Sequence, residues 1–196
     1  MGTLNYLIWV EDNQIPYVCE LDTYKGLDDG DIYAMWQGRS LQGKFPASAE
    51  FHMSRDFPDN TVLADTLNNV WYLIIGSERL KSFLEQHGVS DVEYHKVAIR
   101  DHKGKRAGEY YIINPINAID CIDHKASGTV FDKATKTDVE KLKRLVLRDD
   151  QLDPDRQVFR IFGYPEGILV REDLARAIGK AFQGIKFKKI SPTTKK

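Results

Sequence analysis

Short apolar segments separated by Gly, Pro, Asp and Asn dominate this chain of 196 residues and constrain its fold more than any other feature. The segments are rich in aromatic and β-branched residues, a composition typical of strands. Residues 97–100 and 109–113 form the clearest predicted hairpin, because Gly104 supplies the positive φ of a turn and Pro115 ends the returning strand. We predict strands at residues 4–10, 17–21, 31–36, 70–75, 92–100, 109–113, 116–121, 142–147, 157–162 and 168–170.

Two segments have the spacing of amphipathic helices. The first follows Ser77, a good N-cap residue, and ends before Gly88, a natural C-cap. The second starts near Arg171, which is a weak N-cap, and ends at Gly184. Apolar residues three and four positions apart share one face of each helix, so we expect that face to be buried. The faces contain Leu80, Phe83, Leu84 and His87 in the first helix and Leu174, Ala177, Ile178, Ala181 and Phe182 in the second.

These segments predict an α+β fold, in which the two helices pack on a mostly antiparallel sheet of short strands. Each helix is followed, after a Gly, by a short apolar strand, and the two helix–strand units lie about 94 to 96 residues apart. This similarity is typical of an internal duplication. The alternative is that any helix–strand unit capped by Gly has the same pattern.

Charge is unevenly distributed, although 28 basic and 29 acidic residues give a net charge of only -1. A balance this close excludes a uniformly basic nucleic-acid binder. Residues 1–62 hold four basic and ten acidic side chains, whereas residues 186–196 hold five lysines and no acid. We therefore divide the chain into an acidic N-terminal part of the same globule (1–62), an α+β core (63–190) and a basic tail (191–196) that we expect to be frayed.

No segment has the pattern of a signal peptide or a membrane span. The apolar run 6–10 is short and lacks a basic flank, and the run 70–75 is far too short to cross a bilayer. Cys19 and Cys121 have no disulfide-framework or metal-site spacing, which favours buried free thiols in a reducing compartment. We expect a cytoplasmic protein that does not bind membranes.

The strongest candidate for catalysis is the run Asp120-x-x-Asp123-His124, because two carboxylates and an imidazole are groups that bind a divalent metal and activate water. On a strand, however, Asp120 and Asp123 would point to opposite faces, and all three residue types are ordinary at a turn. The sequence also lacks phosphate-binding, zinc-hydrolase and nucleophile-elbow motifs. We therefore expect no catalytic residue, cofactor or metal, and keep a metal-dependent hydrolase using Asp120, Asp123 and His124 as an alternative.

The acidic N-terminal part is the strongest candidate for a binding surface. Its carboxylates lie among aromatic residues, and such a surface suits a basic partner, because charge speeds the encounter and aromatic side chains supply binding energy. The alternative is that residues 28–31 form a solvated turn and that Tyr33 and Trp36 belong to the core. We assign partner binding to Glu11, Asp12, Tyr24, Asp28, Asp29 and Asp31.

Five lysines near the C-terminus offer positive charge for phosphate contacts. Only one aromatic residue, Phe187, lies among them, and no nucleic-acid-binding fold pattern accompanies them. A solvated terminus is the simpler interpretation, so nucleic acid is not the expected partner. A nucleic-acid or regulatory binding module stays as a second alternative, using Lys186, Lys188, Lys189, Lys195 and Lys196.

The middle and the end of the chain carry a succession of motifs with a known counterpart. The stretch 71–84 (WYLIIGSERLKSFL) is followed by 109–114, 119–123, 159–161, 168–170 and 184–187. This succession resembles immunity family eleven of bacterial polymorphic toxin systems, formerly a domain of unknown function. The resemblance covers about residues 62–187 and is loose before them. It implies a cytoplasmic antidote that is encoded beside a toxin and protects the producing cell and its kin.

The function implied by this resemblance is to bind and neutralise a cognate toxin that is secreted or delivered by contact. An inhibitor needs a rigid scaffold and a complementary surface but no catalytic group, which agrees with the motifs above. If the toxin is a nuclease, its groove is basic, and the acidic part of the antidote competes there with nucleic acid. The adjacent gene is expected to encode the toxin. The sequence leaves the oligomeric state open, a homo-oligomer included.

Overall fold

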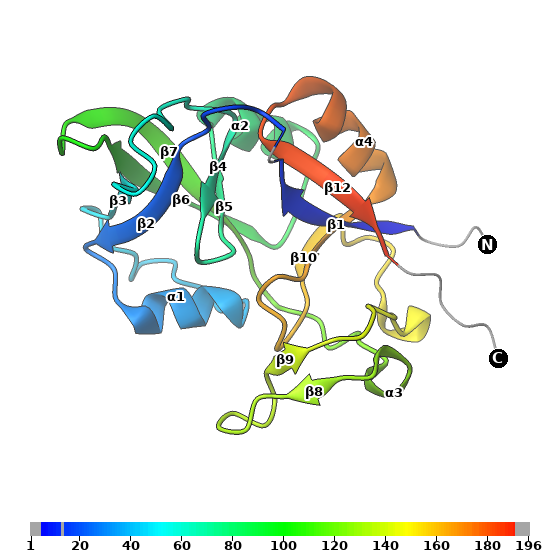
Figure 1. The fold of residues 1–196 in the computed structure, drawn as a ribbon. Coiled ribbons are helices and arrows are strands. Elements are labelled where there is room, and N and C mark those ends of the chain that lie inside the picture. The colour runs from blue at the N-terminus through cyan, green and yellow to red at the C-terminus, as the bar shows by residue number, and fades with distance from the viewer. Residues whose placement is uncertain (1–4, 13, 191–196) are drawn as a thin grey trace.

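The computed structural model describes residues 5–12 and 14–190. Over these residues the chain forms a closed barrel, a four-stranded sheet, a two-stranded sheet and four α-helices (Figure 1). None of the helices in this part of the chain is long and apolar enough to cross a membrane. The helices are α1 (Asp29–Trp36), α2 (Glu78–Gln86), α3 (His124–Ser127) and α4 (Glu172–Ala181), with a 3-10 turn, η1, at Asp149–Gln151.

Six strands close the barrel. In order around it they are β2 (Glu20–Lys25), β3 (Glu50–Met53), β6 (Val92–Arg100), β7 (Arg106–Pro115), β5 (Ile74–Gly76) and β4 (Thr66–Asn69). The longest ladder is the predicted hairpin of β6 and β7, which pairs Val92 with Pro115. Fully buried side chains such as Phe51 and Ile112 fill the barrel, and Met35 of α1 joins them, so α1 packs against it.

The four-stranded sheet stands beside the barrel. Its order is β10 (Val158–Arg160), β11 (Ile168–Arg171), β1 (Tyr6–Glu11) and β12 (Ile185–Lys189). Successive side chains of a strand point to opposite faces. Ile168 and Val170 therefore join a core with α2 and α4, whereas Leu169 joins a cluster on the other face. Because Ile113 of barrel strand β7 lies in the same core as the two helices, barrel, helices and sheet pack together.

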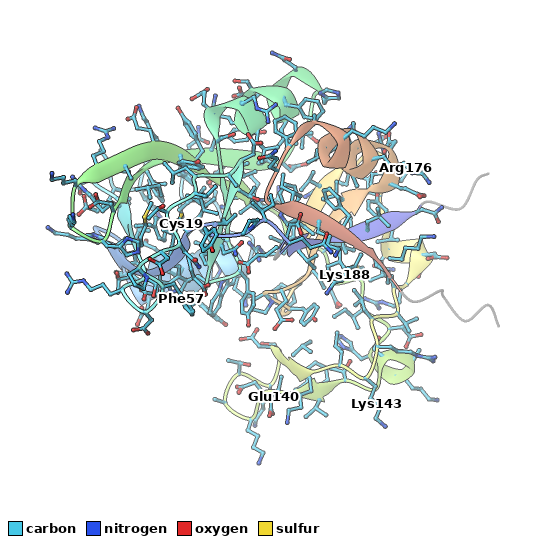
Figure 2. The ribbon with its side chains drawn as sticks, turned by 45° about the horizontal axis from the view of Figure 1, so that its top comes forward. Cys19, Phe57, Glu140, Lys143, Arg176 and Lys188 are labelled. Atoms are coloured by element: carbon cyan, nitrogen blue, oxygen red, sulfur yellow. The ribbon has the colours of Figure 1, made fainter. Side chains whose placement is uncertain are left out.

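The segment between β7 and β10 covers the other face of the sheet and then projects from the molecule. Ile122 and Leu147 pack in one cluster with Phe159 of β10. Residues 124–141 hold α3 and the small sheet of β8 (Val130–Phe131) and β9 (Val139–Lys141), and we call residues 124–148 the lobe. Figure 2 shows Glu140 and Lys143 on the lobe, away from the barrel that contains Cys19.

The structure confirms an α+β fold and both predicted helices. The Ser77 side chain caps α2 by accepting a hydrogen bond from the Leu80 amide (3.2 Å), whereas Arg171 offers α4 no side-chain cap. Burial agrees with the predicted apolar faces at their centres, whereas His87 and Ala181, at the helix ends, are exposed and Ala177 is partly buried. The buried members include Leu80, Leu84, Leu174 and Ile178, while Phe83 is only partly buried, against the ring of Phe182. Cys19 and Cys121 are both buried free thiols.

The predicted arrangement of one mostly antiparallel sheet with two helices is wrong. The strands divide between three sheets, and the barrel includes two parallel pairs, β2 with β4 and β3 with β6. The strands that follow α2 and α4 lie in different sheets, since β6 belongs to the barrel and β12 to the four-stranded sheet. Local patterns predict where a strand lies but do not specify its partner, which depends on contacts far apart in the chain.

The predicted strand at residues 31–36 is a helix. Asp28 accepts a hydrogen bond from the Asp31 amide (2.9 Å), and the Asp31 carboxylate accepts one from the Asp28 amide (3.1 Å). This reciprocal pair is a capping box, which satisfies two amides at a helix start. The residues are therefore also not the solvated turn considered above. The spacing of the buried Ile32 and Met35, three residues apart, suits the helix that follows.

Three other predicted strands differ from the structure. In the segment 70–75 the strand begins only at Ile74, because residues 70–73 form a turn. The segments 116–121 and 142–147 contain no named strand and take part only in isolated bridges, Ile119 with Ile161 and Ile122 with Leu147. The predicted tail, 191–196, lies outside the described residues.

Candidate partner-binding surface

Residues 69–73, which are the last residue of β4 and the turn that leads to β5, are built around the buried side chain of Asn69. The Asn69 amide group donates to the carbonyl oxygens of Leu67 (3.3 Å) and Leu73 (2.8 Å). Its oxygen accepts from the amides of Trp71 and Leu73, both at 3.1 Å. Four hydrogen bonds to one buried side chain give this turn a single conformation, because each of them is costly to leave unmade.

The neighbouring residues Trp71 and Tyr72 make different contacts. The Trp71 ring packs on Tyr24 (5.1 Å between ring centroids), and its carbonyl oxygen accepts a hydrogen bond from the Trp36 indole (2.6 Å). Tyr72 has a φ of 52°, which is unfavourable for a non-glycine residue, and is 48% exposed. Its carbonyl oxygen accepts a hydrogen bond from the fully buried Arg160 (3.3 Å). The turn thus holds an exposed aromatic side chain in a strained backbone conformation.

The start of α1 brings three of the predicted acidic residues together beside this turn. Asp28 and Asp31 form the capping box, and Asp29 accepts a hydrogen bond from the Tyr24 hydroxyl. That bond, together with burial, raises the pKa of Tyr24 to about 12, so the tyrosine stays neutral and keeps donating. Because Tyr24 also packs on Trp71, the acidic helix start and the turn form one continuous structure.

Asp28 is both the N-cap of α1 and a predicted binding carboxylate, and two substitutions at this position separate the cap from the charge. Asp28→Ala should lower the free energy of unfolding by about 1 kcal/mol, because it removes the N-cap of α1. Asp28→Asn should leave it nearly unchanged, because Asn caps helices as well as Asp does. Urea unfolding of the two variants measures the difference, and equal losses would contradict the capping role.

Glu11 meets the same turn from the end of β1. Its carboxylate accepts a hydrogen bond from the backbone amide of Asn69 (2.9 Å). Burial raises the pKa of Glu11, against the opposing effect of that hydrogen bond, and Glu20 raises it further. Asp12 lies one residue on, where its side chain accepts a hydrogen bond from the Gln14 amide (3.1 Å). The six predicted binding residues therefore fall into two groups, Tyr24 with the three α1 aspartates and Glu11 with Asp12, and both groups adjoin residues 69–73.

Several acidic residues of the protein pair with a basic side chain, whereas the predicted binding carboxylates do not. Glu50, Glu85 and Asp65 pair with Arg100 (2.8 Å), Lys81 (2.9 Å) and Arg79 (2.6 Å), respectively. Across residues 5–12 and 14–190, no ion pair involves any of the five predicted binding carboxylates, which are Glu11, Asp12, Asp28, Asp29 and Asp31. Negative charge is thus left uncompensated at this surface.

Three residues of this region were not predicted as part of a site. Val70 and Tyr72 are exposed at the turn, by 52% and 48%, and Glu166 lies near Tyr72 on the loop between β10 and β11. Val70 and Tyr72 were not expected at a surface, because the run 70–75 has the pattern of a buried strand. Only the Asn at position 69, a frequent turn residue, marks the turn.

The residues of the alternative hydrolase site hydrogen-bond or pair with other groups of the protein. Asp123 is the N-cap of α3 and accepts from the Ala126 amide (2.9 Å), while Asp120 lies 3.3 Å from Arg148 and 3.8 Å from the His124 ring. Within the described part of the chain, no group of three or more His, Cys, Asp or Glu residues is arranged to hold a metal ion. Of the C-terminal lysines, Lys186, Lys188 and Lys189 are exposed on β12, and Lys195 and Lys196 lie outside the described residues.

Comparison with known proteins identifies the family. A family model described as Immunity protein family (Imm11) matches residues 13–192, which is nearly the whole chain. No curated protein matches the sequence. The match confirms the resemblance found in the middle and end of the chain and extends it over most of the acidic N-terminal part. The chain therefore belongs to the Imm11 immunity protein family.

Proposed function

We propose that this protein binds a cognate protein toxin, encoded by the adjacent gene, and neutralises it through the acidic surface around residues 69–73. The observation that carries the proposal is the uncompensated charge of the predicted binding carboxylates, next to exposed Val70 and Tyr72. Carboxylates without a basic partner keep their negative charge available to attract a basic protein, and a rigid exposed aromatic residue supplies contact area at low entropic cost. Family membership supports the immunity role.

The shape of the surface favours binding without large rearrangement. The Asn69 hydrogen bonds, the α1 capping box and the Tyr24–Asp29 bond hold its residues in place. A preorganised surface loses little conformational entropy when a partner binds, so more of the contact energy appears as affinity. A toxin with a basic substrate groove, such as a nuclease, fits this charge, and binding there would occlude its active site.

Co-expression with the product of the adjacent gene tests the proposal. We expect the wild-type protein to restore growth of cells that make the toxin and to co-purify with it. An inactive toxin variant can be co-expressed even with antidote variants that do not protect, so it serves as the control for expression and co-purification. Growth arrest despite abundant folded protein, together with no co-purification, would contradict the proposed function.

Residues of the alternative hydrolase site should not affect protection. We expect Asp123→Asn and His124→Ala to leave survival within about twofold of wild type, because Asn retains the α3 cap and the His124 ring contacts only nearby residues, Asp120, Thr129 and exposed Phe131 among them. Survival is measured beside thermal unfolding and toxin binding. Lost protection at normal stability and normal binding would instead indicate a catalytic role.

A further inference from the structure

A cavity of about 210 Å³ opens between the barrel and the four-stranded sheet, beside residues 69–73. Its buried lining residues include Trp9 of β1, Leu73 and Ile74 near β5, and Ile168 of β11. Tyr72, Glu166 and Glu11 lie at its mouth, where Tyr72 and Glu166 are exposed and the Glu11 carboxylate is partly covered by its neighbours. The cavity therefore has an apolar floor and an acidic mouth.

The size of the cavity favours one side chain as its occupant. A single water needs only about 10–15 Å³, so this space is much too large for a single structural water. Pockets that enclose a drug-sized ligand or cofactor are larger, about 300–1,000 Å³. An intermediate volume suits the side chain of one residue inserted from a partner protein.

The charge of the mouth favours a cation. No Lys or Arg residue is among the described residues that line the cavity, and neither Glu11 nor Glu166 has a basic partner there. The Glu11 carboxylate accepts one hydrogen bond from the Asn69 backbone amide (2.9 Å), and the Glu166 carboxylate accepts from the hydroxyls of Tyr164 (3.3 Å) and Tyr72. Both carboxylates keep further acceptor capacity. Burial already raises the pKa of Glu11, so a bound cation would relieve the cost of ionising it.

Arg160 hydrogen-bonds the backbone beside the cavity mouth, but its guanidinium is not available to the carboxylates there. It is fully buried, and its guanidinium donates to the carbonyl oxygens of Pro165 (2.6 Å) and Tyr72 (3.3 Å). Pro165 immediately precedes Glu166, and Tyr72 lies in the turn between β4 and β5. Arg160 thus acts as a positioning residue that ties the two sides of the mouth together, and it forms no ion pair among the described residues.

Resting on the proposed function, we propose that the cavity receives an arginine side chain of the toxin, with its stem on the apolar floor and its guanidinium between Glu11 and Glu166. Arginine suits the site better than lysine, because its planar head donates several hydrogen bonds at once and stacks on aromatic rings such as Tyr72. Buried anchors of this kind dominate the binding energy of many interfaces.

The test measures dissociation of the purified toxin, the product of the adjacent gene, from charge-removing variants. Glu166→Gln and Glu11→Gln should each raise the dissociation rate about tenfold to a hundredfold, because each leaves a buried guanidinium without one of its partners. Gln retains an oxygen for the Asn69 amide, so thermal unfolding should stay unchanged. Glu140→Gln, on the exposed lobe strand β9, is the matched control and should have no effect.

A double-mutant cycle identifies the arginine. One toxin Arg→Ala substitution should raise the dissociation rate by a similar factor, and combining it with Glu166→Gln should add little. If wild type binds the toxin but both Gln variants dissociate at the wild-type rate, the inference is overturned while the proposed function stands. If wild type does not bind the toxin, both are overturned. Competition by free arginine with no such coupled toxin residue would also overturn the inference, since it indicates a small-molecule site.

Discussion

Replacing Leu80 by Ala should lower the free energy of unfolding by about 2–5 kcal/mol, because the side chain is fully buried where α2, the barrel and the four-stranded sheet meet. One of its methyl groups packs beside Gly76 and Ile113, so the substitution removes contacts with both the helix side and the barrel side of this core. For a chain of this size each kcal/mol corresponds to roughly 2–4 °C, so thermal unfolding should occur at a clearly lower temperature.

A control on the same helix separates packing from helix propensity. Glu85→Ala removes an exposed side chain that pairs with Lys81 (2.9 Å), and we expect it to change stability by less than about 0.5 kcal/mol. Calorimetry of both variants makes the comparison. Similar, small changes in both would show that Leu80 is not a central packing residue and that α2 docks less tightly than the structure indicates.

Reversing Asp28, Asp29 and Asp31 to Lys together should slow association with the toxin about tenfold or more at low ionic strength. Exposed charges act mainly on the encounter rate, which electrostatic attraction raises by roughly 10–10³ in favourable cases. The effect should shrink as salt screens the charges. Since the triple Lys variant also destroys the α1 capping box, its stability should fall, contrary to what an exposed turn would predict.

A second variant separates charge from structure. Asp28→Asn, Asp29→Asn and Asp31→Gln together remove the three charges, while Asn and Gln retain the capping hydrogen bonds at the first and fourth positions. This variant should slow association less than the Lys variant, because it removes attraction without adding repulsion.

Replacing Lys186, Lys188 and Lys189 by Gln should leave the association rate unchanged. Stopped-flow association at two salt concentrations decides the matter, and an unaltered rate for the Lys variant would place the interface elsewhere, with residues 101–127 the next candidate.

The elements that could be predicted from the sequence are those fixed by local physics. Ser77 and Gly88 mark both ends of α2, and the spacing of Leu174 and Ile178 predicts the buried face of α4. The β6–β7 hairpin follows from two strand-like runs joined by a turn residue with positive φ, Gly104. In each case the residues that decide the structure lie within a few positions of one another, so their pattern is visible without the fold.

The candidate surface was predicted only in its charges. The acidic character of residues 1–62 is a property of composition, and it led to the prediction that Glu11, Asp12, Tyr24 and the α1 aspartates bind the partner. It misassigned α1, because Ile32, Tyr33 and Trp36 have strand propensity while the capping box at Asp28 and Asp31 fixes a helix start. Strand propensity and a helix cap thus compete in one segment, and the capping box decides the structure.

What the sequence determined by itself is the family, the α+β class, the two amphipathic helices and the acidic character of the first third. Only the tertiary structure decided that six strands close into a barrel and that Asn69 shapes a turn between Trp71 and Tyr72. It alone placed Glu11 and Glu166, 155 positions apart in the chain, at the mouth of one cavity. The physical reason is that strand partners and cavity walls are set by packing between distant segments, whose joint free energy no local pattern contains.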